Sequence, residues 1–271
     1  MQLLKRNDHW IKTLARTGLV AKGVVYCLTA ILTIMSALQM GNASSGDADK
    51  GGIFKMVHEQ PLGKILLSII TVGLICYAVW RLVMAFKDTE DKGKDWKGLG
   101  QRAVYFFSGA VYLSISVIAG KLILNNTQSS GNSRQQLARE LLDKPMGVWL
   151  AAAVAISMMG VGIYQVYRAA SGKYKKYVKA GMHSNNNERT ILIRSGQLGY
   201  TARGIVWLIV GWLFLKAATS ANANEAGNTG KAFQWLQSSY GNILLFLVAA
   251  GLFCYGVFMF MRAKYQPIHT S

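Results

Sequence analysis

Early in the chain stands the motif Gly18-Leu-Val-Ala-Lys-Gly-Val-Val-Tyr26, and a matching motif occurs late in the chain as Gly199-Tyr-Thr-Ala-Arg-Gly-Ile-Val-Trp207. A weaker copy, Val104-Tyr-Phe-Phe-Ser-Gly-Ala-Val-Tyr112, lies between them. All three copies share a cation or hydroxyl, then Gly, two small or branched residues and an aromatic residue. A pattern that recurs at wide spacing indicates an internally repeated architecture, so we expect three copies of one structural unit.

Each copy also has a second half that repeats. These stretches read Gly73-Leu-Ile-Cys-Tyr77-Ala-Val-Trp-Arg81, Gly160-Val-Gly-Ile-Tyr164-Gln-Val-Tyr-Arg168 and Gly251-Leu-Phe-Cys-Tyr255. The third copy has its arginine, Arg262, one helical turn further on. A short amphipathic segment and a Pro or Gly turn precede each stretch, at residues 54–63, 137–147 and 233–241, and the middle copy has three extra residues between turn and tyrosine. We expect the units to span residues 13–90, 96–172 and 190–265.

Composition places these units in a membrane. Of the 271 residues, 52% are hydrophobic and only 15% are charged, which is unusual for a soluble domain of this length. Six uncharged apolar stretches can each supply the roughly 20 helical residues that cross a bilayer. We therefore predict an all-α integral membrane protein with six transmembrane helices. Because each two-helix unit starts and ends on the same side, the three repeats should be parallel and related by a pseudo-threefold axis along the membrane normal.

The charge distribution predicts the orientation. The chain has 30 Lys and Arg against 12 Asp and Glu, a formal charge of +18. No acidic residue lies in the apolar stretches, and the basic residues gather in the amino-terminal region and on alternate loops. The positive-inside rule then places both termini in the cytoplasm. Anionic lipid headgroups are the expected partners of the basic loops, and without an aromatic-interleaved basic motif we expect no nucleic acid.

The repeated helix pairs resemble a bacterial membrane-protein family, domain of unknown function 1206, over about residues 13–263. The resemblance is strongest in the first and third copies, and Ser108 departs from it where the family pattern favours a cation. It implies the fold and a location in the bacterial cytoplasmic (inner) membrane. It implies no activity.

Two cations inside the predicted helices are candidates for a site. Lys22 and Arg203 lie about two turns into their helices, where a charge is costly enough to suggest function. Their long stems could instead lie along the apolar surface and carry the charge to the headgroups. The functional alternative is convergence near the pseudo-axis on a phosphate or carboxylate, with the cations Lys22, Arg203, Arg16, Arg81, Arg102 and Arg168.

Aromatic residues recur at matching places and predict helix packing, with hydroxyls bonded to neighbours, or a lined pocket. This set comprises Tyr26, Tyr77, Tyr112, Tyr164, Trp207 and Tyr255. The three cysteines fall within helices, and the histidines lie in tails or loops, so we expect no disulfide framework, metal site or other cofactor.

No nucleophile motif, phosphate-binding Gly loop or pair of intramembrane carboxylates occurs, so we do not expect an enzyme. Two functions remain. The first is a structural or accessory membrane protein that binds lipid headgroups or a membrane partner, and the small-residue helix surfaces could also serve a homo-oligomer. The alternative is a channel or carrier for a small anionic solute that uses the basic cluster on the cytoplasmic side.

Overall fold

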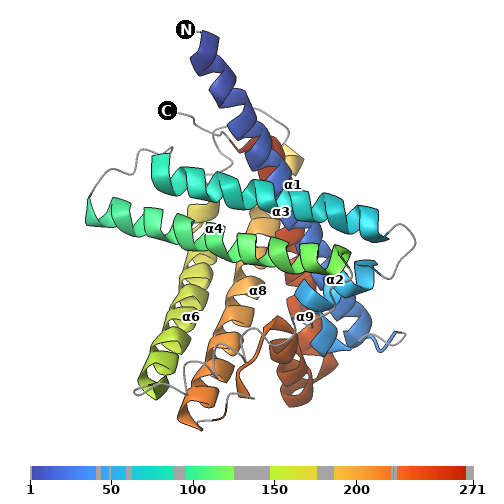
Figure 1. The fold of residues 1–271 in the computed structure, drawn as a ribbon. Helices are drawn as coiled ribbons and strands as arrows, with labels where there is room; N and C mark the ends of the chain where they lie inside the picture. Colours follow the sequence, from blue (N-terminus) through green and yellow to red (C-terminus); the bar gives the residue numbers. More distant parts are fainter. Residues whose placement is uncertain are drawn as a thin grey trace.

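The computed structural model describes residues 2–40, 44–48, 50–58, 63–87, 95–124, 147–175, 186–220, 222 and 225–266, and no β-strand occurs among them. Long helices make up almost all of this part of the chain (Figure 1). The elements are α1 (Gln2–Ala37), η1 (Ser45–Asp47), α2 (Lys50–His58), α3 (Gly63–Lys87), α4 (Trp96–Ile123), α6 (Gly147–Ala170), η3 (Lys173–Lys175), α8 (Asn186–Thr219) and α9 (Thr229–Tyr265).

Six of these helices are long and apolar enough to cross a membrane. The candidate spans are Lys12–Ala37, Gly63–Phe86, Gly98–Ile123, Val148–Ala170, Arg189–Thr219 and Thr229–Tyr265. The prediction of an all-α protein with six transmembrane helices is therefore confirmed. The first repeat supplies α1 and α3, the second α4 and α6, and the third α8 and α9.

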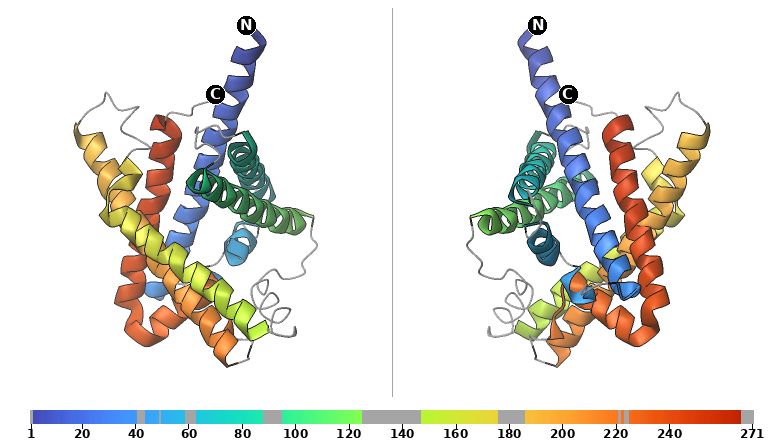
Figure 2. Two further views of the ribbon diagram at one scale, coloured as in Figure 1. Left: turned by 90° about the vertical axis from the view of Figure 1, so that its left-hand side faces the viewer. Right: turned by 90° about the vertical axis from the view of Figure 1, so that its right-hand side faces the viewer.

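The helices pack most closely across the repeat boundaries. Helix α3 pairs with α4, α6 with α8, and α9 with α1, so that each repeat is joined to the next. Within repeats, α1 packs on α3 and α8 on α9, whereas α4 and α6 make no comparable contact among the described residues. The α3–α4 pair lies across the other long helices (Figures 1 and 2).

Glycines set the helix crossings within the first and third repeats. A Cβ on Gly18 would lie 2.5 Å from Tyr77 Cα, and one on Gly199 would lie 2.6 Å from Tyr255 Cα. Both distances are shorter than real Cβ contacts, so only glycine allows the backbones to approach this closely. The two repeats thus use the same crossing at the same residues of their shared motif.

A second set of contacts fixes the register between repeats. The carbonyl oxygen of Gly23 lies against Gly256, that of Gly162 against Gly204, and that of Ala78 against Gly109. We call the first spanning helix of each repeat (α1, α4 and α8) an odd helix and the second (α3, α6 and α9) an even helix. Gly23, Gly109 and Gly204 are equivalent in the odd-helix motif, so their partners Ala78, Gly162 and Gly256 on the even helices are equivalent too.

This register corrects the predicted alignment of the middle repeat. Val161, and not Tyr164, matches Tyr77 and Tyr255, because it directly precedes the small residue of the contact. Tyr164 is 57% exposed on the outer surface of α6, so its predicted place in packing or a pocket was wrong. The three extra residues that separate the turn from this tyrosine account for the shift.

The segments that introduce the even helices differ between repeats. In the first, α2 is a separate helix packed against α3 and α4. In the third, the segment is continuous with the span except at Gly241, whose positive φ of 80° allows the kink. Asn228 caps the start of this helix by accepting a hydrogen bond from the Lys231 backbone N–H at 2.9 Å. The corresponding segment of the middle repeat, residues 137–146, lies outside the described residues.

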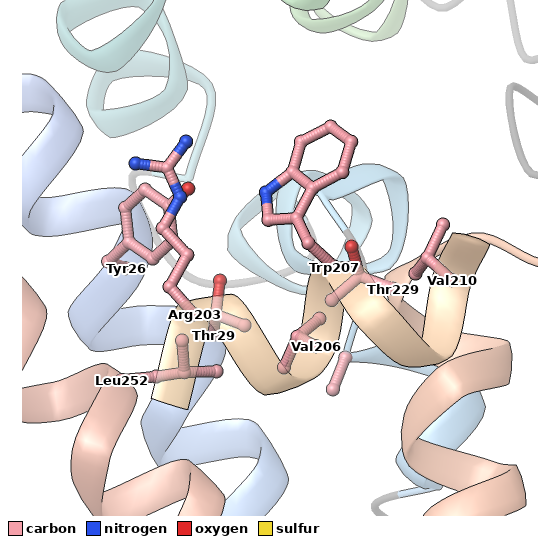
Figure 3. Close-up of a pocket in the computed structure, with 9 residues that line it drawn as sticks. Tyr26, Thr29, Arg203, Val206, Trp207, Val210, Thr229 and Leu252 are labelled. Carbon is pink, nitrogen blue, oxygen red and sulfur yellow. The ribbon is translucent and has the colours of Figure 1, made fainter. Parts of the chain in front are cut away.

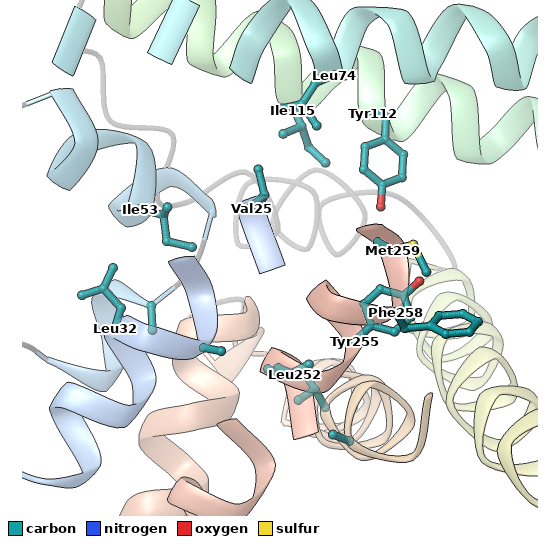
Figure 4. Close-up of a cluster of buried hydrophobic side chains, with 14 of the residues drawn as sticks. Val25, Leu32, Ile53, Leu74, Tyr112, Ile115, Leu252, Tyr255, Phe258 and Met259 are labelled. Atoms are coloured by element: carbon teal, nitrogen blue, oxygen red, sulfur yellow. The ribbon is translucent and has the colours of Figure 1, made fainter. Parts of the chain in front are cut away.

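The buried side chains form a core around the crossing of the helix pairs. Tyr77, Tyr255 and Phe258 are fully buried, and Tyr112 of α4 points toward Tyr255 of α9 (Figure 4). Outside the spans, Tyr174 of η3 donates a hydrogen bond to the Ile193 carbonyl oxygen at 2.8 Å, and burial raises the pKa of its hydroxyl. The core therefore contains an unusual number of aromatic hydroxyls, which need polar partners.

Candidate functional site: a cationic cavity inside the membrane domain

A cavity of about 180 Å³ lies where the three repeats meet, and we call it the central cavity. Its lining comes from α1, α3, α4, α6, α8 and α9, so every candidate span contributes. The cations among the described lining residues are Lys22, Arg81, Arg168, Arg203 and Arg262, and no Asp or Glu is among them.

The repeats supply this lining from equivalent positions. Each odd helix has one such position, and each even helix has two that are three residues apart. The three repeats therefore have nine equivalent positions. They are Lys22, Ser108 and Arg203 on the odd helices, Arg81, Gln165 and Met259 at the first even-helix position, and Met84, Arg168 and Arg262 at the second. All except Met259 line the central cavity. The cavity therefore lies on the pseudo-threefold axis of the repeats.

Lys22 is held inside the bundle by tyrosines. The side chain is only 4% exposed, and its ammonium group donates a hydrogen bond to the Tyr77 hydroxyl at 3.2 Å. Its Nζ atom also lies 4.8 Å from the ring centre of Tyr77 and 5.0 Å from that of Tyr112. Aromatic faces at this distance stabilise a cation. The alternative in which Lys22 reaches along the surface to the headgroups was thus wrong.

Arg203 occupies the same place in the third repeat. Its guanidinium donates a hydrogen bond to the Tyr255 hydroxyl and lies over the rings of Tyr255, at 5.0 Å, and Tyr26, at 5.5 Å. Its Nε atom is buried without a hydrogen-bond acceptor among the described residues. A buried donor without an acceptor is costly, and a hydrogen bond to an anion would remove that cost.

The even-helix arginines are held differently. Arg81 donates two hydrogen bonds to the Tyr77 hydroxyl, from Nε at 2.9 Å and from Nη2 at 2.8 Å. Arg262 donates two to the Gln266 side-chain oxygen, at 2.9 and 2.6 Å. The guanidinium of Arg168 lies 4.8 Å from the ring centre of Tyr200. Neutral oxygens and aromatic faces thus help to orient these cations.

Gln165 is a polar side chain of the cavity whose amide group is unsatisfied among the described residues. It is 6% exposed, and neither its amide nitrogen nor its amide oxygen has a hydrogen-bond partner among the described residues. Burying such an amide costs roughly 1–3 kcal/mol. Both amide atoms are covered by protein atoms, so a ligand with a donor and an acceptor group would remove this cost only after the side chain rotates toward the cavity.

Arg203 also lines a second pocket of about 50 Å³, together with Tyr26, Thr29, Trp207 and Thr229 (Figure 3). Thr229 begins α9, and Thr29 lies in the second half of α1, toward the end of the bundle opposite α9's carboxyl end. Arg262 and Gln266, by contrast, line the central cavity at that carboxyl end. The Arg203 side chain therefore belongs to two compartments at different depths.

The predicted cation set is only partly brought together. Lys22, Arg81, Arg168 and Arg203 line the central cavity, but Arg16 and Arg102 do not. Arg16 is exposed on α1, and Arg102 donates hydrogen bonds to the carbonyl oxygens of Ala85 and Phe86 at the end of α3. The position of an arginine near a helix end in the sequence therefore did not predict whether its side chain points into the cavity.

The aromatic set is also divided. Tyr77 and Tyr112 pack beside Lys22, Tyr255 lines the central cavity, and Tyr26 and Trp207 line the second pocket. Sequence analysis did not include Arg262, Gln165 or Tyr200 in the site. The sequence did contain a signal for the correct register of the even helices. In each repeat the packed small residue lies fifteen positions after the turn glycine, as in the pairs Gly63 and Ala78, Gly147 and Gly162, and Gly241 and Gly256. Counting from those glycines brings Arg262 level with Arg168.

The fold and site define a membrane protein of three two-helix repeats around a cationic cavity. The sequence profile of the family described as Domain of Unknown Function (DUF1206) matches the chain three times, at residues 17–88, 103–172 and 198–266, and the chain belongs to that family. It is 31% identical over 268 residues to an uncharacterized protein, YxxB, of Bacillus subtilis (strain 168), covering 98% of this chain and 94% of the relative. No solved structure matches.

Proposed function

We propose that this protein binds an anionic group, a phosphate or a carboxylate, in the central cavity, and that it serves as a structural or accessory membrane protein holding a lipid headgroup or a membrane partner. The observation that carries the proposal is the convergence of five cations, from all three repeats, on a cavity whose described lining has no Asp or Glu. The proposal involves no covalent step, in keeping with the expectation that the protein is not an enzyme.

The electrostatics favour an anion strongly. Like charges repel more in a low-dielectric interior than in water, and each buried charge also loses its hydration. An anion at the centre would offset both costs for several cations at once. The hydrogen bonds that it accepts from them would be charge-assisted, and hydrogen bonds to charged groups contribute about 1.5–3 kcal/mol each.

Thermal unfolding of the detergent-purified protein tests the proposal. We expect inorganic phosphate to raise the melting temperature of the wild type as its concentration exceeds the Kd, while an equal ionic strength of chloride has less effect. Arg203→Met should weaken phosphate binding by about tenfold or more, the equivalent of losing one charge-assisted hydrogen bond. Arg194→Met, an exposed position on the same helix, is the matched control. Equal phosphate stabilisation of both variants would contradict the proposal.

A carrier for a small anionic solute is the second candidate, and Arg203 is the observation that favours it. This residue lines both the central cavity and the second pocket, so one cation could pass an anion between them. Purified protein in liposomes should then support phosphate or carboxylate uptake that Arg203→Met abolishes. Binding without uptake would leave the accessory function alone.

We also infer that both termini face the cytoplasm of a bacterial cell. The start of α1 and the end of α9 lie at the same end of the molecule (Figure 2), and the sequence carries its basic residues in the amino-terminal region and on alternate loops. The positive-inside rule supports this orientation.

A further inference from the structure

The central cavity has one wall that the bundle does not close. Helices α4 and α6 belong to the same repeat, yet they do not pack on each other as α1 packs on α3 and α8 on α9. Val104 of α4 and Val161 of α6 both line the cavity, and both are also exposed at the outer surface, at 64% and 44%. The cavity therefore reaches the surface between two membrane-spanning helices, at an opening that we call the α4–α6 portal.

Burial of the spans supports this opening. Only 28% of the α4 span and 22% of the α6 span are buried, against 44–56% for the other four. These two helices thus face the surroundings more than their symmetry mates do. The portal is where the pseudo-threefold arrangement is most incomplete among the described residues.

The depth of the portal indicates what can enter it. Val104 lies six residues inside the start of its span and Val161 nine residues before the end of its own, or about 9 and 14 Å along the helices at 1.5 Å per residue. An opening between two membrane-spanning helices, flanked by residues this far from the span ends, faces the acyl chains of a bilayer whose core is about 30 Å thick. A free anion would have to enter hydrocarbon to use it, whereas a lipid already lies there.

The size of the cavity points the same way. A volume of about 180 Å³ is less than the roughly 300–1,000 Å³ of pockets that enclose a drug-sized ligand. It accommodates a charged head and leaves the remainder of the molecule outside. The apolar valines at the portal suit acyl chains, while Lys22, Arg203 and Gln165 suit the oxygens of the head.

We propose that the occupant of the central cavity is an anionic membrane phospholipid, whose phosphate-bearing head enters through the α4–α6 portal and whose acyl chains remain between α4 and α6. This inference rests on the proposed anion binding and names its ligand class and its route. The phosphate contacts Lys22 and Arg203, and the Gln165 side chain rotates toward the cavity to pair with a hydroxyl or similar group of the head.

Native mass spectrometry of detergent-purified protein tests the route. Phosphatidylglycerol and phosphatidylcholine with the same acyl chains are the probes. The wild type should retain phosphatidylglycerol about tenfold more than phosphatidylcholine, because the choline ammonium next to the phosphate of phosphatidylcholine would be repelled by a cavity lined by five cations. Val104→Trp with Val161→Trp fills the portal from exposed positions and should abolish that preference. Ile69→Trp, at a 65% exposed position on α3, is the matched control and should keep it.

Inorganic phosphate separates the two proposals. Two outcomes overturn the lipid proposal and leave anion binding intact. In the first, phosphate stabilises the wild type but the wild type shows no preference for phosphatidylglycerol. In the second, the portal variant retains phosphatidylglycerol as the wild type does. If neither probe binds the wild type, both proposals fail. Should the double variant unfold, Val104→Trp alone decides between these outcomes.

Discussion

Gln165 shows the conflict between stability and binding at the scale of a single residue. Its amide is buried without a hydrogen-bond partner among the described residues, and replacing such a group with an apolar one of similar shape removes a desolvation cost. We expect Gln165→Leu to raise the unfolding free energy of the lipid-free protein by about 1–2 kcal/mol. The same variant should retain less phosphatidylglycerol.

Thermal unfolding in detergent, followed by tryptophan fluorescence, measures the first effect, and Gln197→Leu at an exposed position is its control. A melting temperature that falls in Gln165→Leu would mean that the amide has a partner in the free protein, and the cavity would lose its unsatisfied group.

The Tyr77 hydroxyl is the acceptor on which two cations depend. It accepts hydrogen bonds from Lys22 Nζ at 3.2 Å and from Arg81 Nε and Nη2 at 2.9 and 2.8 Å. Tyr77→Phe leaves these donors without that acceptor, and we expect a loss of at least about 2 kcal/mol of unfolding free energy. Tyr164→Phe removes an equal group from an exposed position and should change it by less than about 0.5 kcal/mol.

Chemical or thermal unfolding of the two phenylalanine variants side by side checks this prediction. The comparison also tests the register of the middle repeat. Similar losses in both variants would restore Tyr164 to equivalence with Tyr77 and contradict the correspondence of Val161 with that tyrosine.

At the scale of helices, the glycine crossings are the decisive contacts. An Ala side chain at Gly18 or Gly199 would overlap the backbone of Tyr77 or Tyr255, and overpacking of this kind costs typically 1–3 kcal/mol. We expect both Gly18→Ala and Gly199→Ala to lower the melting temperature. Gly160→Ala, where a Cβ meets nothing within 4 Å, should leave it unchanged or slightly higher. A destabilised Gly160→Ala would indicate that α6 packs against a surface absent from this arrangement.

The helices were predictable from sequence because hydrocarbon thickness and hydropathy fix their number and approximate length. The repeat was predictable because Gly18 and Gly199 perform the same steric task and the residues around them match. Two features were not predictable. The side-chain direction of Arg16, Arg102 and Arg262 depends on helix rotation, which apolar composition does not determine when a helix is apolar on every side.

The register of the middle repeat failed for a related reason. The sequence alignment of the repeats matched aromatic residues, and it therefore placed Tyr164 opposite Tyr77 and Tyr255. The structural constraint is the small residue at the helix contact, Gly162, because backbone approach there tolerates no side chain. The small residue at a helix–helix contact therefore predicts the register of a repeat better than a matching aromatic residue does.

At the scale of the whole molecule, three imperfect copies produce one site that no copy contains. Each repeat places one odd-helix and two even-helix positions on the axis, and cations occupy two, one and two of them in chain order. The middle repeat supplies the fewest charges, the unsatisfied Gln165 and both helices of the portal. Divergence of this repeat is thus what turns a symmetric ring of cations into a cavity with an entrance.

Orientation in the membrane is the remaining property of the whole molecule, and single cysteines can establish it. Ser171 follows α6 and Ser220 follows α8, and both are exposed at opposite ends of the bundle. With both termini in the cytoplasm, Ser220→Cys should react with a membrane-impermeant maleimide in intact cells, and Ser171→Cys should react only after the cells are opened. The wild type, whose three cysteines are half-buried within the spans, gives the background labelling. Labelling of Ser171→Cys in intact cells would reverse the orientation and place the α4–α6 portal in the outer leaflet, where the basic loops would no longer face the cytoplasm.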